Sequence, residues 1–282
     1  MLRRLLAPLF LLAVVTARAE EDLGGFMMHH ISNSREWKAT PWGPILHFPS
    51  GWNVAGIDLS ISLHVFLMLV AGALLVLLVI PSTKRKGLAP AGRAGHILEI
   101  MVLFIRDEVV KPNLGEKDTR KWTPFFLTLF FFLLTLNFIS LIPGVPAVGG
   151  NINFTATMAI IIFVVYNVAG VARNGGHYFT NLFPSGLPIA VFPLIAVIEV
   201  LGLFTKAFAL AIRLFANMTA GHVLILSLLG LIVVFKSYLA AGAFVPFTLF
   251  IYLIEILVAF LQAYVFTLLA SLFVGMAVNQ EH

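Results

Sequence analysis

The chain has 282 residues, 60% of them hydrophobic and only 11% charged against roughly 25% in soluble domains, which excludes a soluble globular protein and indicates an integral membrane protein. The sequence contains no cysteine, which excludes disulfides, thiolate metal sites and cysteine nucleophiles. The net charge of +5 does not imply a nucleic-acid partner, because nine of the eighteen Lys and Arg residues lie between Lys84 and Lys121, where they act as topology signals.

The first residues are typical of a secretory signal peptide. Two arginines precede eleven mostly apolar residues at 5–15, and a small-residue cleavage site follows at 17–19. Such a short run cannot cross the roughly 30 Å hydrocarbon core of a bilayer. We predict a cleaved signal peptide over residues 1–19, with an uncleaved anchor as the alternative. In either case the segment 20–58 faces the non-cytoplasmic side.

A membrane domain is predicted over residues 59–282. Its first span, Leu59 to Ile80, contains 22 residues and is closed by Pro81. The basic cluster at 84–86 follows at once, so the positive-inside rule places this end in the cytoplasm. Charged residues interrupt the next segment, 94–111, too often for a span. We predict an amphipathic helix there, lying on the cytoplasmic surface.

Two further spans are predicted, from Phe125 to Ile142 and from Phe154 to Ala172. The Pro- and Gly-containing segment between them is long enough only for a hairpin. Arg173 then marks a second cytoplasmic exit.

The last two apolar runs are unusually long, Leu187 to Phe235 with 49 residues and Tyr238 to Val278 with 41. Each is at least twice the roughly 20 residues that a perpendicular span requires. Each run is therefore either two spans or one steeply tilted helix. No Gly/Pro/Asn cluster divides either run in the middle, so we predict one long helix each. The fold class is then an all-α integral membrane protein with about five transmembrane helices, the last two forming a long, tilted hairpin.

Polar residues interrupt the first of these runs at regular intervals. Glu199, Lys206 and Arg213 follow one another at seven-residue spacing, and Asn217 comes four residues later, which keeps all four on one helix face. His222 lies nine residues beyond Arg213, about 180° round the helix and about 13 Å along it. An arginine at the bilayer centre costs about 2.5–3.5 kcal/mol on insertion scales, so its presence indicates a function.

The second run has its own polar stripe, in which Glu255 and Gln262 are seven residues apart. If the two runs pack as an antiparallel hairpin turning near Ser237, His222 is level with Glu255 and Arg213 is level with Gln262. An imidazole beside a carboxylate can exchange protons near neutral pH.

Structural interpretations compete with these functional ones. His222 alone can serve as a hydrogen bond between helices, and Arg213 can belong to a buried salt bridge. His64 and Asn137, isolated on their spans, favour structural roles, and Lys206 can extend towards the interface. The adjacent histidines at 29–30 have no third ligand at suitable spacing, so we predict no metal site and no cofactor.

The motifs "LAIRLFANMTAGH" and, some fifty residues later, "AFLQAYVFTLLA" resemble subunit a of F-type ATP synthases, the stator subunit beside the rotating ring of c subunits. The resemblance implies that Arg213 is the essential charge and that Glu199, Asn217, His222, Glu255 and Gln262 line a proton path. It implies no catalytic chemistry of the chain's own and a place in a bacterial inner membrane. The implied partners are the c-ring, b-type peripheral stalk subunits, the other ATP synthase subunits and lipid, without nucleic acid.

Departures from the family pattern accompany this resemblance. Some bacterial members carry a carboxylate where His222 lies and a histidine where Glu255 lies, and depth matching predicts that the exchange preserves the pair. Ser140 and Asn151 occupy places where some members have acids.

Two other functions are alternatives. A stand-alone proton-coupled secondary transporter or channel usually shows duplicated halves and broken helices in matching positions, and neither is visible in the sequence. A purely structural anchor leaves Glu199, Arg213 and Glu255 unexplained.

Overall fold

The structure is a computed structural model that describes residues 25, 36–38, 45–47, 53–54, 57–58, 60–82, 85–86, 89–90, 92–142, 144–180, 192–235 and 237–279. The predicted signal peptide at 1–19 and the histidines at 29–30 lie outside the described residues, as does most of the segment 20–58.

Helices make up nearly all of the described chain. They are α2 (Leu63–Ser82), α3 (Gly92–Phe104), the π-helical η1 (Ile105–Val110), α4 (Lys111–Ser140), the 3₁₀ turn η2 (Val148–Gly150), α5 (Ile152–Asn174), α6 (His177–Thr180), α7 (Phe192–Phe235) and α8 (Tyr238–Val278). Three small antiparallel hairpins pair β1 (Glu36–Lys38) with β2 (Ile45–His47), β3 (Asn53–Val54) with β4 (Ile57–Asp58), and β5 (Arg85–Lys86) with β6 (Ala89–Pro90). Within the described residues, five helical segments are long and apolar enough to cross a membrane, as predicted.

The helix of the first span begins and ends later than predicted, since α2 starts at Leu63 and residues 60–62, which we expected to belong to it, are not helical. We expected Pro81 to close the helix, but α2 continues through it to Ser82. Proline removes only one backbone donor, and in the last turn of a helix this loss is small.

The predicted amphipathic helix is present and is separate from the span that follows it. Ile105, Val109 and Leu114 are buried and residues 106–108 are exposed, so the second half of the segment has an apolar inward face and a polar outer face, whereas in α3 the apolar Ile97 and Ile100 are exposed. The chain then leaves the helical conformation at Gly115, where φ is +77° and a side chain would be strained. The prediction of a separate helix before the span is therefore confirmed, while its position on a membrane surface stays a prediction.

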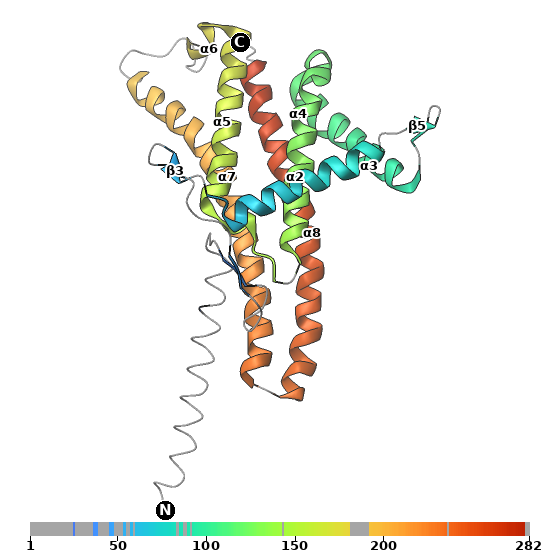
Figure 1. Ribbon diagram of the computed structural model, residues 1–282. Coiled ribbons are helices and arrows are strands. Elements are labelled where there is room, and N and C mark those ends of the chain that lie inside the picture. Colours follow the sequence, from blue (N-terminus) through green and yellow to red (C-terminus); the bar gives the residue numbers. More distant parts are fainter. Residues whose placement is uncertain are drawn as a thin grey trace, which may run out of the picture.

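The last two apolar runs are single helices, as predicted. α7 has 44 residues and α8 has 41, lengths of about 66 Å and 61 Å against a hydrocarbon core of about 30 Å. They form an antiparallel hairpin, and the Ser237 hydroxyl begins α8 by accepting a hydrogen bond from the backbone N–H of Leu239 at 3.3 Å. In Figure 1, α2 runs across the direction of α4, α5 and this hairpin. If α2 crosses the bilayer, α7 and α8 are steeply tilted in it.

The C-terminal half of α8 lies at the centre of the bundle, in contact with α4, α5 and α7. Its inward positions carry small residues, including Ala259, Ala263 and Ala270, which let neighbouring helices approach closely. At Gly275 the approach is so close that a Cβ would collide with the backbone carbonyl of Asn113. This packing fixes the position of α8 along its axis relative to the other helices. It thereby also fixes the level at which the polar residues of α8 lie.

Candidate functional site

Arg213 lies on the outer face of α7. Its side chain is exposed, and so are Ala209, Ala216 and Ala220, which follow the same helix face at spacings of four, three and four residues. The guanidinium therefore stands in a strip of small residues that leaves room for a neighbouring helix.

No ion pair or hydrogen bond to Arg213 occurs within the part of the chain that the structure describes. Glu199, on the same helix, is about 21 Å away along the axis. The structural interpretation of Arg213 as half of a buried salt bridge is therefore not supported by the described residues.

A hydrogen bond joins the two long helices one turn beyond Arg213. The Asn217 amide nitrogen donates to Oε1 of Gln262 at 2.6 Å, and Gln262 is only 3% exposed. We expected Gln262 to be level with Arg213, and its side chain bonds to Asn217, one turn further along α7. The amide nitrogen of Gln262 is buried without a hydrogen-bond partner among the described residues.

Glu255 packs directly against α7 at Gly221. A Cβ added at position 221 would collide with the carboxylate of Glu255, so only glycine leaves the space that the carboxylate fills. Both His222 and Glu255 are half-buried. Because Gly221 is the residue before His222, this contact agrees with the depth match predicted for the pair.

Two polar residues of other helices have the interhelical bonds expected of structural residues. The Asn137 amide donates to the backbone carbonyl of Ala259 at 2.9 Å and thereby ties α4 to α8. Nδ1 of His64 lies 3.3 Å from the amide nitrogen of Asn151, which ties α2 to the start of α5. The side chains of Asn137 and His64 are nearly fully buried.

Fewer polar residues lie on the part of α7 that precedes Arg213 than on the part that follows it. Lys206 is half-buried, with Nζ 5.8 Å from the ring centroid of Phe273, so the cation rests on an aromatic face of α8. Glu199 is half-buried a further two turns away. Next to this region the Tyr166 hydroxyl donates to the backbone carbonyl of Leu203 at 3.0 Å and holds α5 against α7.

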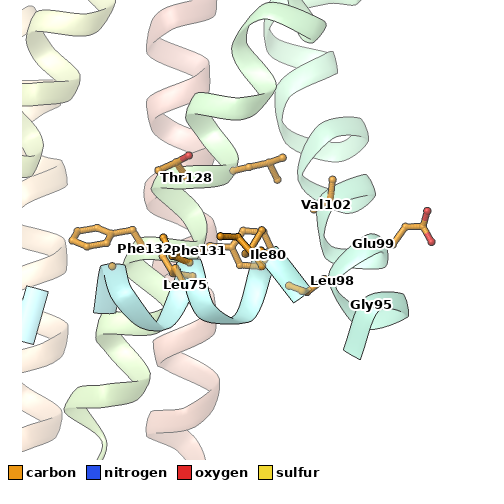
Figure 2. Close-up of a pocket in the computed structure, with 13 residues that line it drawn as sticks. Leu75, Ile80, Gly95, Leu98, Glu99, Val102, Thr128, Phe131 and Phe132 are labelled. Carbon is orange, nitrogen blue, oxygen red and sulfur yellow. The ribbon is translucent and has the colours of Figure 1, made fainter. Parts of the chain in front are cut away.

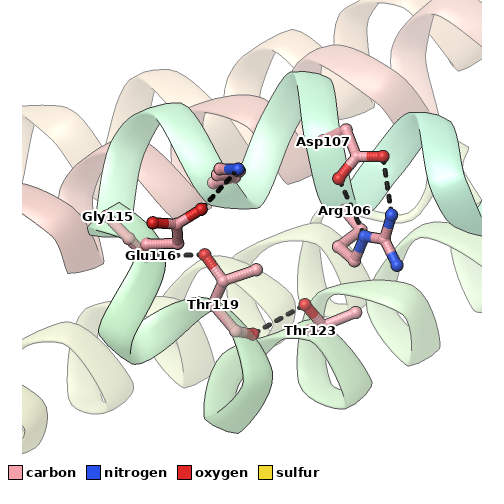
Figure 3. A network of polar contacts seen from close by, with 7 residues as sticks. Arg106, Asp107, Gly115, Glu116, Thr119 and Thr123 are labelled. Atoms are coloured by element: carbon pink, nitrogen blue, oxygen red, sulfur yellow. Dashed lines mark hydrogen bonds and ion pairs between the residues drawn. The ribbon is translucent and has the colours of Figure 1, made fainter.

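Charged residues gather where α4 begins and α5 and α8 end. Arg106 pairs with Asp107 at 2.8 Å, and Lys111 pairs with Glu116 at 2.8 Å on the two sides of the break at Gly115 (Figure 3). Nearby, the Asn279 amide donates to the carbonyl of Leu114 at 3.3 Å, which attaches the end of α8 to the same region. The end of α8 and the start of α4 therefore lie on one side of the molecule.

An apolar groove of about 660 Å³ lies between α2, α3 and α4, away from the polar residues of α7 and α8. Its lining includes Leu75, Leu98 and Phe131, and its one charged residue, Glu99, points away from the groove in Figure 2. Without an inward-facing charged group, the groove is a poor candidate for an ion path.

Sequence reasoning did not single out Gly221 or Thr219. Gly221 lies next to His222 within a quoted motif, and a glycine inside a long apolar helix is itself a sign of close approach. The hydroxyl oxygen of Thr219 is buried without a hydrogen-bond partner among the described residues. Burial of that one atom is a property of the packed bundle and has no signature in the sequence.

The comparison with known proteins decides the family. The model of the family described as ATP synthase A chain matches residues 65–275. The chain belongs to this family. ATP synthase subunit a of Chloroherpeton thalassium is 46% identical over 90% of this chain and 77% of its own length. ATP synthase subunit a 2 of Chlorobaculum tepidum is 43% identical over 93% of this chain and 75% of its own.

A more distant relative agrees with this assignment. ATP synthase subunit a of Anaeromyxobacter dehalogenans is 39% identical over 91% of this chain and 71% of its own length. Membership of the ATP synthase A chain family makes the protein a multi-pass membrane subunit of an ATP synthase. It gives no support to the alternative of a stand-alone transporter.

Proposed function

We propose that this chain is the proton-translocating stator subunit of an ATP synthase membrane sector, with Arg213 as the charge that separates two offset proton routes. The observation that carries the proposal is the position of Arg213. It is an exposed guanidinium on a membrane helix, without an ion pair in the described chain, between two unlike groups of polar residues.

The physical role of Arg213 follows from its charge. A carboxylic acid carried past it by a rotating ring is neutral in lipid, because desolvation opposes ionisation. Beside the fixed cation of Arg213 the same acid ionises and releases its proton. Arginine keeps its own proton at any physiological pH, so it cannot pass protons on and blocks a direct leak. Each proton moved through 100 mV carries about 2.3 kcal/mol, which drives the rotation.

The two routes are assigned by the residues on either side of Arg213. Asn217, His222, Glu255 and Gln262 lie towards the α7–α8 turn and form the route from the non-cytoplasmic side. Glu199 lies towards the charged end of the molecule and belongs to the route to the cytoplasm. The Glu255–His222 pair is the proton-exchanging element of the first route, because a carboxylate and an imidazole transfer protons over the physiological pH range.

The partners are assigned from the exposed face of α7. The strip of Ala209, Ala216 and Ala220 around Arg213 carries side chains small enough to admit a helix of the c-ring in close contact. The b-type peripheral stalk subunits hold the chain against rotation, and the chain has no catalytic chemistry of its own. We place the N-terminus outside the cytoplasm and the C-terminus in the cytoplasm of a bacterial inner membrane, because the end of α8 is bonded to Leu114, within the part of the chain between Lys84 and Lys121 that carries nine of the eighteen Lys and Arg residues.

The test of this function is the variant Arg213→Ala in the assembled complex. ATP-driven proton pumping into inverted vesicles is expected to disappear, because the ring carboxylate loses the cation that ionises it. Lys206→Ala is the matched control, since it removes a cation from the same face of α7 one heptad away. Copurification of the complex measures assembly in both variants. Normal pumping by Arg213→Ala would overturn the assignment.

A further inference from the structure

The apolar groove between α2, α3 and α4 is continued by a polar hollow between η1 and the start of α4. Along α3 the groove is lined as far as Val102, and Arg106, one helical turn later, lines the polar hollow. Along α4 the polar hollow is lined as far as Pro124, and the groove begins at Leu127. The two spaces, of about 660 Å³ and 430 Å³, therefore adjoin along both of their walls.

The polar hollow carries a net positive charge. It is lined by three cations and two carboxylates, which are Arg106, Lys111, Arg120, Asp107 and Glu116. Two of the cations are paired with the two carboxylates at 2.8 Å (Figure 3). Arg120 is exposed and has no ion pair or hydrogen bond within the part of the chain that the structure describes. The hollow therefore offers one guanidinium to an anion from outside the chain.

The groove beside this guanidinium is open to the surroundings of the molecule. Val76 and Ile80, which line it from α2, are 55% and 60% exposed. Nothing lies within 4 Å of a Cβ built at Gly72, so the floor of the groove is also unfilled by the chain itself. In a bilayer such a groove is filled by acyl chains or by a helix of another subunit. An apolar helix leaves the charge of Arg120 uncompensated, whereas a phospholipid joins apolar chains to an anionic phosphate in one molecule.

We propose that the groove and the polar hollow together bind one anionic phospholipid of the cytoplasmic leaflet, with an acyl chain in the groove and the phosphate at Arg120. A guanidinium can bind a phosphate through two parallel hydrogen bonds. The residues after Arg120 are typical of the level of lipid headgroups, since Nζ of Lys121 lies 5.9 Å from the ring centroid of the half-buried Trp122. The leaflet follows from the orientation proposed above, whereas the binding itself does not depend on Arg213.

The test uses assembled ATP synthase in phosphatidylcholine vesicles that contain a small fraction of lipid with a photoreactive diazirine in one acyl chain. The diazirine is carried by phosphatidylglycerol, which is anionic, in one set of vesicles and by phosphatidylcholine, which is zwitterionic, in the other. After illumination, mass spectrometry of the peptides of this chain measures the lipid adducts on the residues that line the groove. The yield is expected to be at least about fivefold higher with phosphatidylglycerol, because a basic residue near the membrane surface favours an anionic lipid by about this factor.

Two variants separate the contributions of the headgroup and the acyl chain. Arg120→Gln is expected to lower the phosphatidylglycerol yield to that of phosphatidylcholine. Lys117→Gln is the matched control and should leave the yield unchanged, since Lys117 is an exposed cation of the same helix that does not line the polar hollow. Gly72→Leu places a side chain in the groove and is expected to remove the adducts of both lipids.

Three results would overturn the proposal. Equal yields from the two lipids in the unaltered complex would exclude selection of an anionic headgroup. A lack of adducts on the groove would leave it to a helix of another subunit, and equal losses in Arg120→Gln and Lys117→Gln would assign the preference to general surface charge. If Gly72→Leu does not assemble, Arg120→Gln decides alone, because it changes only an exposed side chain. Pumping by Arg213→Ala is a separate measurement, so failure of this proposal is distinguishable from failure of the proposed function.

Discussion

The two groups of polar residues on either side of Arg213 are built differently. Towards the α7–α8 turn, polar side chains contact one another across helices, as in the 2.6 Å bond from Asn217 to Gln262 and the contact of Glu255 with Gly221. Towards the charged end, Glu199 and Lys206 are half-buried, and Lys206 rests on an aromatic ring. The first group is tightly packed, whereas the second is loose.

This difference indicates how precisely each of the two groups of residues positions its carboxylate for proton transfer. A carboxylate held against a glycine has a fixed position, which short-range proton transfer requires. A half-buried carboxylate without such contacts acts mainly through its charge, which attracts protons without guiding them to one atom. Substitutions on the tightly packed side are therefore expected to have larger effects than substitutions on the loose side.

The largest effect beyond Arg213 is expected for Glu255→Gln. The amide has the shape of the acid but cannot take up a proton, so proton-driven ATP synthesis should fall about 100-fold. Proton flux and ATP synthesis in energised vesicles, together with copurification of the complex, give the measurement. Thr248→Val is the control, because Thr248 lies on the same helix and its hydroxyl donates to the carbonyl of Phe244 within that helix. An unchanged rate in Glu255→Gln would reassign Glu255 to a structural role.

A smaller effect is expected for Gly221→Ala. The added methyl group occupies the space of the Glu255 carboxylate and displaces it from the level of His222. A displacement of this size should slow proton flux about tenfold while the complex still assembles. Gly202→Ala on the same helix is the control, since nothing lies within 4 Å of a Cβ there. Equal rates in the two variants would show that the position of Glu255 against α7 is unimportant.

The smallest effect is expected for Glu199→Gln. If Glu199 acts only through its charge, proton flux should fall about threefold or less, and the loss should shrink as the salt concentration rises. Flux measured at low and high ionic strength provides the check. A salt-independent loss as large as that of Glu255→Gln would contradict the difference drawn between the two sides.

Much of the fold could be predicted because its signals are local. The lengths of the apolar runs and the lack of turn residues within them determined that α7 and α8 are single helices, and their boundaries at Phe235, Tyr238 and Val278 agree with the prediction. The end of α2 was placed too early, because proline weakens only one bond in a last turn. Depth matching predicted that Glu255 is level with His222, and the contact of Glu255 with Gly221 agrees with it, while the level of Gln262 with Arg213 stays a prediction.

What the sequence determined by itself is the membrane class, the spans, the long hairpin and the helix face that Arg213 shares with its polar neighbours, since these depend on composition and on the helical period. Only the tertiary structure decided that Arg213 points out of the bundle and that Glu255 rests on Gly221. It also decided that His64 of α2 reaches Asn151. Contacts between helices depend on how side chains of distant segments pack, and a shift of one turn, about 5.4 Å, changes every partner without changing any local pattern.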